Sequence, residues 1–290
     1  MKLFIFIIIN IFIIYLISKK KKERPIKVCL CTIGTQENRY INEFVNHYQK
    51  LGYDHIYIYD NNNIKDERID DIYFNSNFVT IIDYRGYKNK DSQYKAYYNC
   101  YKNNNKKYDW LSFFDVDEFL AIRPKKHTIQ TFLDNTRYKK CQNIKINWLL
   151  YSSNKEIFHF KNETLQKRFK KQMFNEDANI HIKSTVRGNL KRNYWRRWEN
   201  SHSSIDTFKS CSSSGKRVSG KTAFVNPPDY KYAFLKHYYY KSFEEFCLKL
   251  KRGWPDSTNK NKWIDNLIND NKYSKNKLKI IKEILNLTFN

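Results

Sequence analysis

The residues best suited to chemistry lie in one short segment. An apolar run at 111–114 is followed by Asp115, Asp117 and Glu118. If the backbone stays extended after the run, side chains two positions apart point to the same side, so Asp115 and Asp117 converge. Two carboxylates at such a short distance repel each other unless a cation neutralises them. Mg²⁺ and Mn²⁺ are suitable cations because they prefer oxygen ligands. The spacing therefore predicts a divalent-metal site at Asp115 and Asp117.

A metal held by few carboxylates suggests what the site would act on. Such an ion keeps open positions that suit phosphate oxygens. With a nucleoside-diphosphate sugar as substrate, it would neutralise the charge that builds on the leaving diphosphate. Phosphatases of the haloacid dehalogenase class also carry D-x-D after a strand, with the first Asp as nucleophile, but no threonine follows here to orient a phosphate. The alternative explanation for an isolated D-x-D is an ordinary solvent-exposed loop with no catalytic role.

The segments that must position these carboxylates alternate between strand and helix patterns. Short apolar and β-branched runs predict strands at 26–32, 55–60, 78–83, 110–114 and 143–150. Helical spacing and capping residues predict helices at 36–51, 92–104, 129–134 and 242–252, with little order between 151 and 242. This alternation requires crossover connections, so we predict an α/β fold with a mostly parallel sheet flanked by helices.

Three of the predicted strands end in a carboxylate. Asp60, Asp83 and Asp115 each stand at the end of an apolar run. In an open α/β sheet the ligand crevice lies beyond the carboxyl ends of the strands. We therefore expect these three residues at one edge of the sheet.

The six cysteines do not indicate a zinc site. No C-x-x-C pair occurs, and no histidine stands at zinc-ligand spacing from them. Cys29 and Cys31 alternate inside an apolar run, which predicts buried thiols on one face of a strand.

The N-terminal segment has the composition of a membrane anchor. Leu3 to Ser18 is apolar except for Asn10 and is followed by four lysines. As a helix it would be about 24 Å long, which can span a bilayer with snorkelling lysines. No small-residue cleavage site occurs between Tyr15 and Pro25, so we predict an uncleaved anchor and a single-pass membrane protein.

The side of the membrane is left open by these residues. Four lysines on the C-terminal flank of the anchor predict a cytoplasmic domain by the positive-inside rule. Two N-x-[ST] sequons, at Asn162 and Asn286, would suit a lumenal domain. In a chain so rich in Asn, two sequons can also arise by chance.

The net charge of +25 predicts an anionic partner. Lysine and arginine are scattered along the chain, and the densest stretch outside the anchor, 191–198, is short and mixed with aromatic residues. This distribution does not favour nucleic acid as the partner. The alternative to an enzyme is nevertheless a membrane-tethered basic protein that binds nucleic acid or acts as a scaffold.

Residues 34–149 carry a set of motifs that resembles one enzyme class. The motifs are at 36–41, 51–61, 84–86, Gln93, 96–97, Cys100 and 114–119, the last reading FDVDEF. A looser likeness continues through 168–169, 183–184, His202, Cys211 and 237–246. The chain resembles glycosyltransferases of the GT-A fold, closest to the family 92 and family 2-like group.

The resemblance implies a donor site and a metal site. Such enzymes transfer a sugar, commonly a hexose, from a nucleotide sugar to a glycan or another hydroxyl acceptor. The residues implied in donor binding are Glu37, Asp60, Gln93, Asp115, Lys183 and Lys241. Mn²⁺ or Mg²⁺ would be held by Asp115, Asp117 and a downstream histidine, with His237 preferred over His202. Arg187 is a further candidate for contact with the diphosphate.

The resemblance also implies inversion at the sugar carbon, which needs a carboxylate base. Glu118 is the nearest candidate in sequence and joins Asp117 as an expected catalytic residue; Glu176, Asp177 and Asp229 are alternatives. A fold that keeps the D-x-D but has lost catalysis is a third possibility. Kinship slightly favours the lumen of the endoplasmic reticulum or Golgi.

The chain divides into three parts in this interpretation. Residues 1–24 form the anchor and its basic flank, and residues 25–255 form the GT-A-like domain. Residues 256–290 form a C-terminal helical extension, because 275–287 has amphipathic spacing.

Overall fold

The computed structural model describes most of the chain between Arg24 and Arg252. The described residues are 24–65, 68–69, 76–87, 91–160, 162–191, 202, 209–220, 222–252 and 283. The predicted anchor helix, Leu3 to Ser18, and nearly all of the predicted C-terminal extension lie outside them. Within the described ranges, no helix is both long and apolar enough to cross a bilayer.

The first half of the chain alternates strands and helices as predicted. Its elements are β1 (Val28–Gly34), α2 (Asn38–Lys50), β2 (His55–Asp60), β3 (Val79–Asp83), α3 (Ser92–Asn104), β4 (Trp110–Phe113), β5 (Glu118–Ile122), α4 (Ile129–Leu133), η1 (Thr136–Tyr138) and β6 (Asn143–Tyr151). The hydroxyl of Thr128 accepts a hydrogen bond from Thr131 N, so the predicted cap of α4 is confirmed. The short strand β5 was not predicted.

The second half contains short strands that the sequence pattern did not show. Its elements are α5 (Leu165–Arg168), β7 (Gln172–Met173), η2 (Asp177–Ile180), β8 (Ile182–Arg187), β9 (Ser210–Cys211), β10 (Ala233–His237) and α7 (Phe243–Arg252). β10, which the sequence pattern did not predict, ends at His237. The helix predicted at 242–252 is confirmed.

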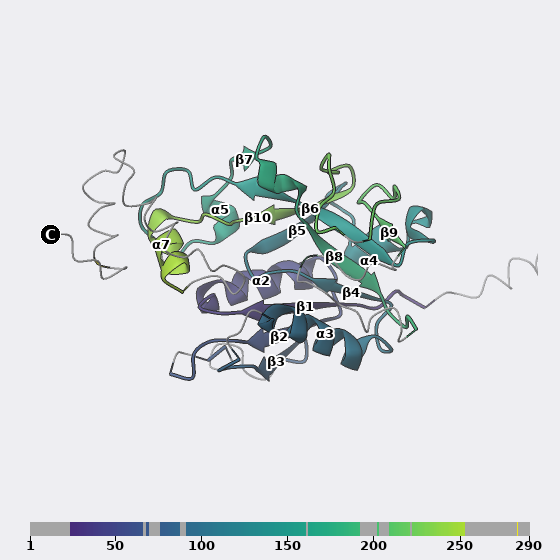
Figure 1. Cartoon of the computed structure of the whole chain (residues 1–290), viewed down its shortest axis with the longest axis horizontal. Coiled ribbons are helices and arrows are strands. Elements are labelled where there is room, and N and C mark those ends of the chain that lie inside the picture. The colour runs from purple at the N-terminus through teal and green to yellow at the C-terminus, as the bar shows by residue number, and fades with distance from the viewer. Residues whose placement is uncertain are drawn as a thin grey trace, which may run out of the picture.

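The strands form one curled sheet (Figure 1). Its order is β3-β2-β1-β4-β8-β6-β10-β5, with β7 and β9 paired to β6. β3, β2, β1 and β4 are parallel, β8 is antiparallel to both β4 and β6, and β5 is antiparallel to β10. The predicted α/β class with a mostly parallel sheet and flanking helices is confirmed.

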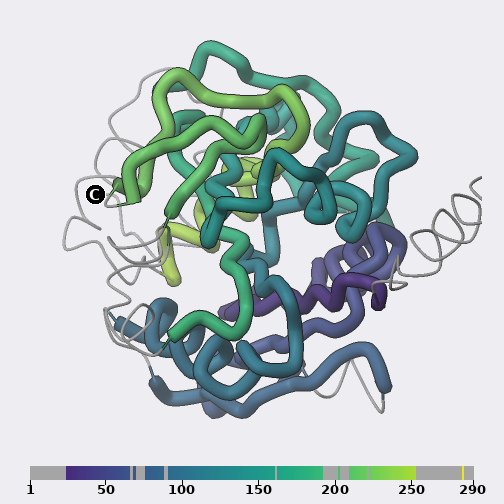
Figure 2. The backbone as a smooth tube through the Cα atoms, turned by 90° about the vertical axis from the view of Figure 1, so that its right-hand side faces the viewer, coloured from purple at the N-terminus to yellow at the C-terminus, as the bar shows by residue number. Residues whose placement is uncertain are grey.

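Two helices cover opposite faces of the parallel half, because β1 is apolar on both sides. Val28 and Leu30 pack into a core with α2, whereas Cys29 and Cys31 pack into a second core with α3. The predicted burial of both thiols is confirmed, since neither residue is exposed. In Figure 2 the early segments, in purple and blue, lie on one side of the molecule and the later green segments on the other.

A tight connection links the middle of the sheet to its edge. β4 is fourth in the strand order and β5 is last, although only residues 114–117 separate them in sequence. β5 therefore lies over α2, where the Tyr48 hydroxyl donates to Glu118 O at 2.8 Å. The Nε2 of His47 is 2.9 Å from Leu120 O. The sheet curls around α2, and residues 114–117 bridge its two layers.

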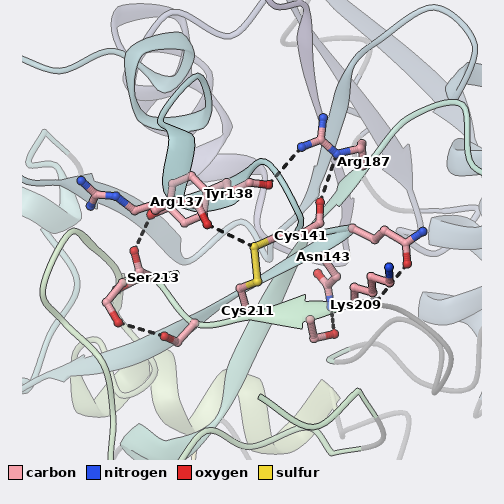
Figure 3. Close-up of a disulfide and its surroundings, with 12 residues drawn as sticks. Arg137, Tyr138, Cys141, Asn143, Arg187, Lys209, Cys211 and Ser213 are labelled. Atoms are coloured by element: carbon pink, nitrogen blue, oxygen red, sulfur yellow. Dashed lines mark hydrogen bonds between the residues drawn. A yellow bond between two sulfur atoms is a disulfide. The ribbon is translucent and has the colours of Figure 1, made fainter. Parts of the chain in front are cut away.

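A disulfide joins the segment before β6 to the short strand β9 of the second half (Figure 3). Cys141 precedes β6 and Cys211 ends β9, and their sequence separation is 70. β9 runs parallel to β6 with Cys211 opposite Ile144. The sequence did not predict this pairing, because spacing along the chain does not show which cysteines meet.

Gly188 is required where β8 leaves the sheet. A Cβ atom at this position would lie 1.9 Å from Tyr108 O and 2.6 Å from Asn105 O, both of them backbone atoms. We expect Gly188→Ala to lower the free energy of unfolding by about 3 kcal/mol, because the backbone has to move. Urea unfolding followed by circular dichroism measures this. Gly34→Ala is the control, since its nearest neighbour is the Ile69 side chain at 3.3 Å; equal losses in the two variants would contradict the prediction.

Candidate functional site

The predicted carboxylates lie in the connection between β4 and β5. The backbone turns here, with Glu118 N donating to Asp115 O at 3.0 Å. The expectation of extended backbone from Asp115 to Asp117 was therefore wrong: a turn is needed because the chain leaves β4 for a distant strand of the sheet. Asp115 and Asp117 consequently have different partners, described in turn below.

Asp115 is held by three donors from two elements. Gln93 Nε2 and the Tyr97 hydroxyl, both on α3, donate to its Oδ1 at 2.5 and 2.9 Å. Lys183 Nζ lies 2.9 Å away, and its side chain is fully buried. The register of β4 and β8 explains this contact: Phe113 pairs with Ser184, so Lys183 falls beside the start of the turn. Of the predicted donor-binding residues, Gln93, Asp115 and Lys183 are thus brought together.

The charge of Lys183 stabilises the ionised form of Asp115. Burial alone would raise the pKa of Asp115, but the nearby ammonium outweighs burial and lowers it below its usual range. In the same way, burial would lower the pKa of Lys183, whereas Asp115 and Glu118 together raise it. Both groups are therefore charged at neutral pH.

Asp117 is nearly buried and faces three cationic or ionisable groups. Its Oδ2 lies 3.3 Å from Lys249 Nζ and 3.7 Å from Lys241 Nζ, and its Oδ1 lies 3.5 Å from His237 Nε2. Burial would raise the pKa of Asp117, but Lys249, Lys241 and His237 lower it well below its usual range. Asp117 and His237, which were predicted to lie together, are therefore neighbours, and Lys241, predicted to bind the donor, lies beside Asp117.

Glu118 stabilises the turn through a hydrogen bond to its backbone. It is 0% exposed, and its Oε2 accepts a hydrogen bond from Asp115 N at 2.9 Å. Its Oε1 has no hydrogen-bond partner among the described residues. Burial raises the pKa of Glu118 well above its usual range. β10 pairs His237 with Glu118, which sets the histidine beside Asp117.

Helix α7 supplies cations that sequence reasoning missed. Ser242 and Glu245 form the predicted capping box, with Ser242 N donating to Glu245 Oε2 at 3.1 Å. Lys249 is four residues after Glu245, and Arg252 is three residues after Lys249. At this spacing all three side chains lie on one face of the helix. That spacing was the available signal for Lys249 and Arg252. This spacing alone did not identify Lys249 and Arg252, because nothing in the sequence shows which face of α7 lies toward Asp117.

Glu37 is paired with the same cations. Its carboxylate lies 2.5 Å from Lys241 Nζ and 3.2 Å from Arg252 Nη1. Glu37 stands immediately before α2, so the start of that helix is tied to Lys241, two residues before α7, and to Arg252 at the end of α7. The predicted donor-binding residues Glu37 and Lys241 therefore meet in the structure.

Asp60 and Asp83 lie at the same carboxyl edge of the parallel strands as Asp115, as predicted, but have partners of their own. Asp60 is buried and accepts hydrogen bonds from Asn62 N and Ile69 N, so it shapes the loop after β2. Asp83 is paired with Arg85 at the exposed end of β3. Arg187 donates to Cys141 O and Tyr138 O rather than facing a diphosphate position.

The alternative bases lie in the later half of the chain. Asp229 accepts hydrogen bonds from Ser212 Oγ and Ser214 N, which commits it to a turn. Asp177 begins η2 and is exposed. Glu176 is half-buried. The pKa of Tyr240 is raised mainly by the burial of Tyr240, and the negative charge of Glu176 raises it further. Glu176 therefore lies close to the segment that leads from His237 to Lys241.

The side chains of the described residues do not form a closed metal cage. No group of three or more His, Cys, Asp or Glu among them is arranged to hold an ion by itself. What the turn presents instead is two carboxylates surrounded by the ammonium groups of Lys183, Lys241 and Lys249. Such alternating charge suits a ligand that carries phosphate groups.

The sequence of the chain is similar to those of one family of known proteins. Residues 24–283 match the family model of glycosyltransferase family 92. A glycosyltransferase family 92 protein of rice, Oryza sativa subsp. japonica, is 27% identical over 124 residues, covering 42% of this chain and 20% of the rice protein. The matched part is thus a fifth of that relative's length. Because the family match includes every site residue described above, the chain belongs to glycosyltransferase family 92.

Proposed function

We propose that the chain transfers a sugar, a hexose being the expected case, from a nucleoside-diphosphate sugar to a hydroxyl of a glycan, with help from a divalent metal. The observation that carries this proposal is the turn after β4. It holds two carboxylates with three lysine ammonium groups within 4 Å of them. A diphosphate and a divalent cation would together complement this pattern of charges.

The donor chemistry of the turn fits Mn²⁺ or Mg²⁺. Carboxylate oxygens are the hard ligands that these ions prefer, and an imidazole is accepted by Mn²⁺. His237 faces Asp117 with Nε2, which lies 3.5 Å from Asp117 Oδ1, so this nitrogen is the one that could share an ion with the carboxylate. We assign Asp115, Asp117 and His237 as the residues that would hold the ion. Their side chains are not arranged as a three-ligand site, so oxygens of the donor diphosphate would have to complete the coordination. When bound, the ion would supply Lewis-acid stabilisation of the leaving diphosphate.

The remaining residues of the site have roles that follow from their contacts. Lys241 and Lys249 lie close enough to Asp117 to bind oxygens of the same diphosphate. Lys183 fixes Asp115, and Glu118 fixes the backbone of the turn. Since Glu118 is wholly buried, we assign it to positioning rather than to contact with the acceptor. Its assignment as the general base is the weaker alternative.

In the proposed reaction the acceptor oxygen forms a bond to the anomeric carbon while the bond from that carbon to the diphosphate oxygen breaks. The acceptor hydroxyl gives its proton to a carboxylate, and the anomeric configuration inverts. Of the carboxylates described in the later half, Glu176 is the candidate for this base. Its support is its half-buried position near Tyr240 and the structural commitment of Asp229.

Two observations support a lumenal position for the domain. Disulfides persist in oxidising compartments, and Cys141 is bonded to Cys211. The sequon residue Asn162 is exposed. We therefore propose a single-pass membrane protein with its catalytic domain in the lumen of the secretory pathway.

The proposed reaction predicts metal-dependent release of nucleotide. The purified full chain would be incubated with UDP- and GDP-sugars, a mixed glycan acceptor and Mn²⁺, with a CMP-sugar, which has no diphosphate, as the control, and nucleotide release would be measured. We expect release from one nucleotide class, loss of at least about 100-fold on addition of EDTA, and recovery when Mn²⁺ is restored in excess.

Two results would count against the assignment. If no donor is consumed, sugar transfer is not supported. If release continues at the same rate in EDTA, the metal role is wrong while transfer stands. Salt-sensitive polynucleotide binding without donor consumption would instead favour a basic nucleic-acid-binding protein.

A further inference from the structure

A sequon and an exposed aromatic ring lie together in a turn before α5. Asn162, Glu163 and Thr164 form an N-x-[ST] sequence, and Asn162 is exposed. Phe160, two residues before Asn162, is 54% exposed. Glu163 N donates to Phe160 O at 3.4 Å, so the chain turns between these residues. Two positions apart, the Cα atoms of Phe160 and Asn162 are separated by at most about 7 Å.

One side of the Phe160 ring faces the protein and the rest faces solvent. The guanidinium carbon of Arg168 lies 5.8 Å from the centre of the ring, and the Arg168 side chain is 0% exposed. The exposed area of Phe160 is therefore on the side of the ring away from Arg168. An aromatic ring left half in water gains free energy if an apolar surface covers it.

The segment that carries this ring is held in place by contacts with α7. His159 N donates to Glu244 Oε2 at 2.8 Å. Arg168 on α5 forms an ion pair with Glu245 on α7 at 3.2 Å, and the two helices lie side by side (Figure 1). Phe160 is therefore presented by a fixed backbone, so a group that packs on its ring would lose little further conformational freedom.

We propose that Asn162 carries an N-linked glycan whose first sugar packs on the exposed side of Phe160. The sugar donor is a lipid-diphosphate-linked oligosaccharide, transferred by the oligosaccharyltransferase of the secretory pathway. The amide nitrogen of Asn162 forms a bond to C1 of the sugar, while the bond from C1 to the diphosphate oxygen breaks. The amide loses one proton, and the lipid diphosphate leaves. The pyranose face of C–H groups is the apolar surface that covers the ring.

This inference rests on the lumenal position proposed above, because the lipid-linked donor is used in that compartment, and not on sugar transfer by the chain itself. Its consequence is a gain in stability. The sugar would reinforce the segment that pairs with the start of α7, the helix that carries Lys249 and Arg252.

Occupancy of the site is tested on the full chain made in a eukaryotic secretory host. The variant Asn286→Gln removes the other sequon, so any N-linked glycan that it carries is at Asn162. We expect the glycosidase PNGase F to increase the gel mobility of Asn286→Gln, and to leave the double variant Asn162→Gln, Asn286→Gln unchanged. Mass spectrometry of the peptide that contains Asn162 should show the glycan directly. If that peptide is found only without a glycan, the proposal is overturned.

Packing of the sugar on the ring is tested by thermal unfolding, with Asn286→Gln as the parent. Removal of the whole glycan by PNGase F should lower its Tm by about 2–4 °C. Trimming by endoglycosidase H, which leaves one sugar on the asparagine, should preserve the parental Tm. Phe160→Ala should show no change in Tm on either treatment. Phe158→Ala is the matched control, since Phe158 is 49% exposed and is not in the turn, and it should respond like the parent.

Two results of thermal unfolding would contradict the packing of the sugar on Phe160. The first is a Tm of the parent that PNGase F does not lower, and the second is an equal loss in Phe160→Ala and the parent. Nucleotide release measured on the same samples separates this site from the proposed reaction. If donor is consumed but Asn162 carries no glycan, the glycan site fails and the reaction stands. If Asn162 carries the glycan and no donor is consumed, the reaction fails and the glycan site stands.

Discussion

Asp117→Asn is expected to lower the rate of sugar transfer by about 10³-fold while the protein stays folded. The carboxylate lies within 4 Å of Lys241, Lys249 and His237. An amide keeps its shape but removes the negative charge, so a divalent ion and the diphosphate it would bind are no longer held. The measurement is kcat and KM for the donor identified by nucleotide release, with Mn²⁺ titrated for each variant.

The control for this prediction is Asp134→Asn. Asp134 is an exposed residue directly after α4 and is not one of the site residues described above, so its replacement should leave kcat unchanged. Circular dichroism and Tm show whether the Asp117 variant is folded, because unpaired lysines at a nearly buried position also cost stability. A folded Asp117→Asn variant that retains more than a tenth of parental kcat at saturating Mn²⁺ would refute the role assigned to this carboxylate.

Removal of the disulfide is expected to cause the largest loss of stability. The bond between Cys141 and Cys211 closes a loop with a sequence separation of 70, for which chain entropy corresponds to about 4 kcal/mol. The double variant Cys141→Ser, Cys211→Ser should therefore unfold at clearly lower urea concentration. Equilibrium urea unfolding under non-reducing conditions measures this change.

Reduction of the parent provides the matched comparison. Dithiothreitol should lower the urea midpoint of the parent nearly to that of the double variant, and should leave the double variant unchanged. The other four cysteines, Cys29, Cys31, Cys100 and Cys247, are buried and are unchanged in the double variant, so both proteins contain them. If dithiothreitol lowers the urea midpoints of the two proteins equally, the stabilising bond is not the one between Cys141 and Cys211.

Elements with a local pattern could be predicted from the sequence. The helix at 92–104 was predicted with the bounds that α3 has, because its ends and spacing depend on nearby residues. β5 and β8 could not be predicted in this way. Each is five or six residues long, and its pairing partners, β10 for β5 and β4 and β6 for β8, are distant in the chain. Strand propensity depends on such neighbours, so the pattern alone is weak.

The site shows the same division between local and distant information. Asp115 and Asp117 could be found because their spacing after an apolar run is visible in seven residues. Lys249 and Arg252 required the direction of the α7 face, which is set by packing against residues more than a hundred positions earlier. The conformation of the turn itself was wrongly predicted as extended, because nothing local showed that β5 belongs to the far edge of the sheet.

The position of the turn between two layers has a consequence for how substitutions would be interpreted. Residues 114–117 have a fixed span to cover, and α2 fills the space beneath β5. Tyr48 sets that spacing through its hydroxyl, which donates to Glu118 O and accepts from Leu120 N. A change in a helix that touches no substrate would alter the separation of Asp115 from Asp117. Inactivating substitutions in α2 would then show that this helix supports the site structurally. They would not be evidence of a second functional site on α2.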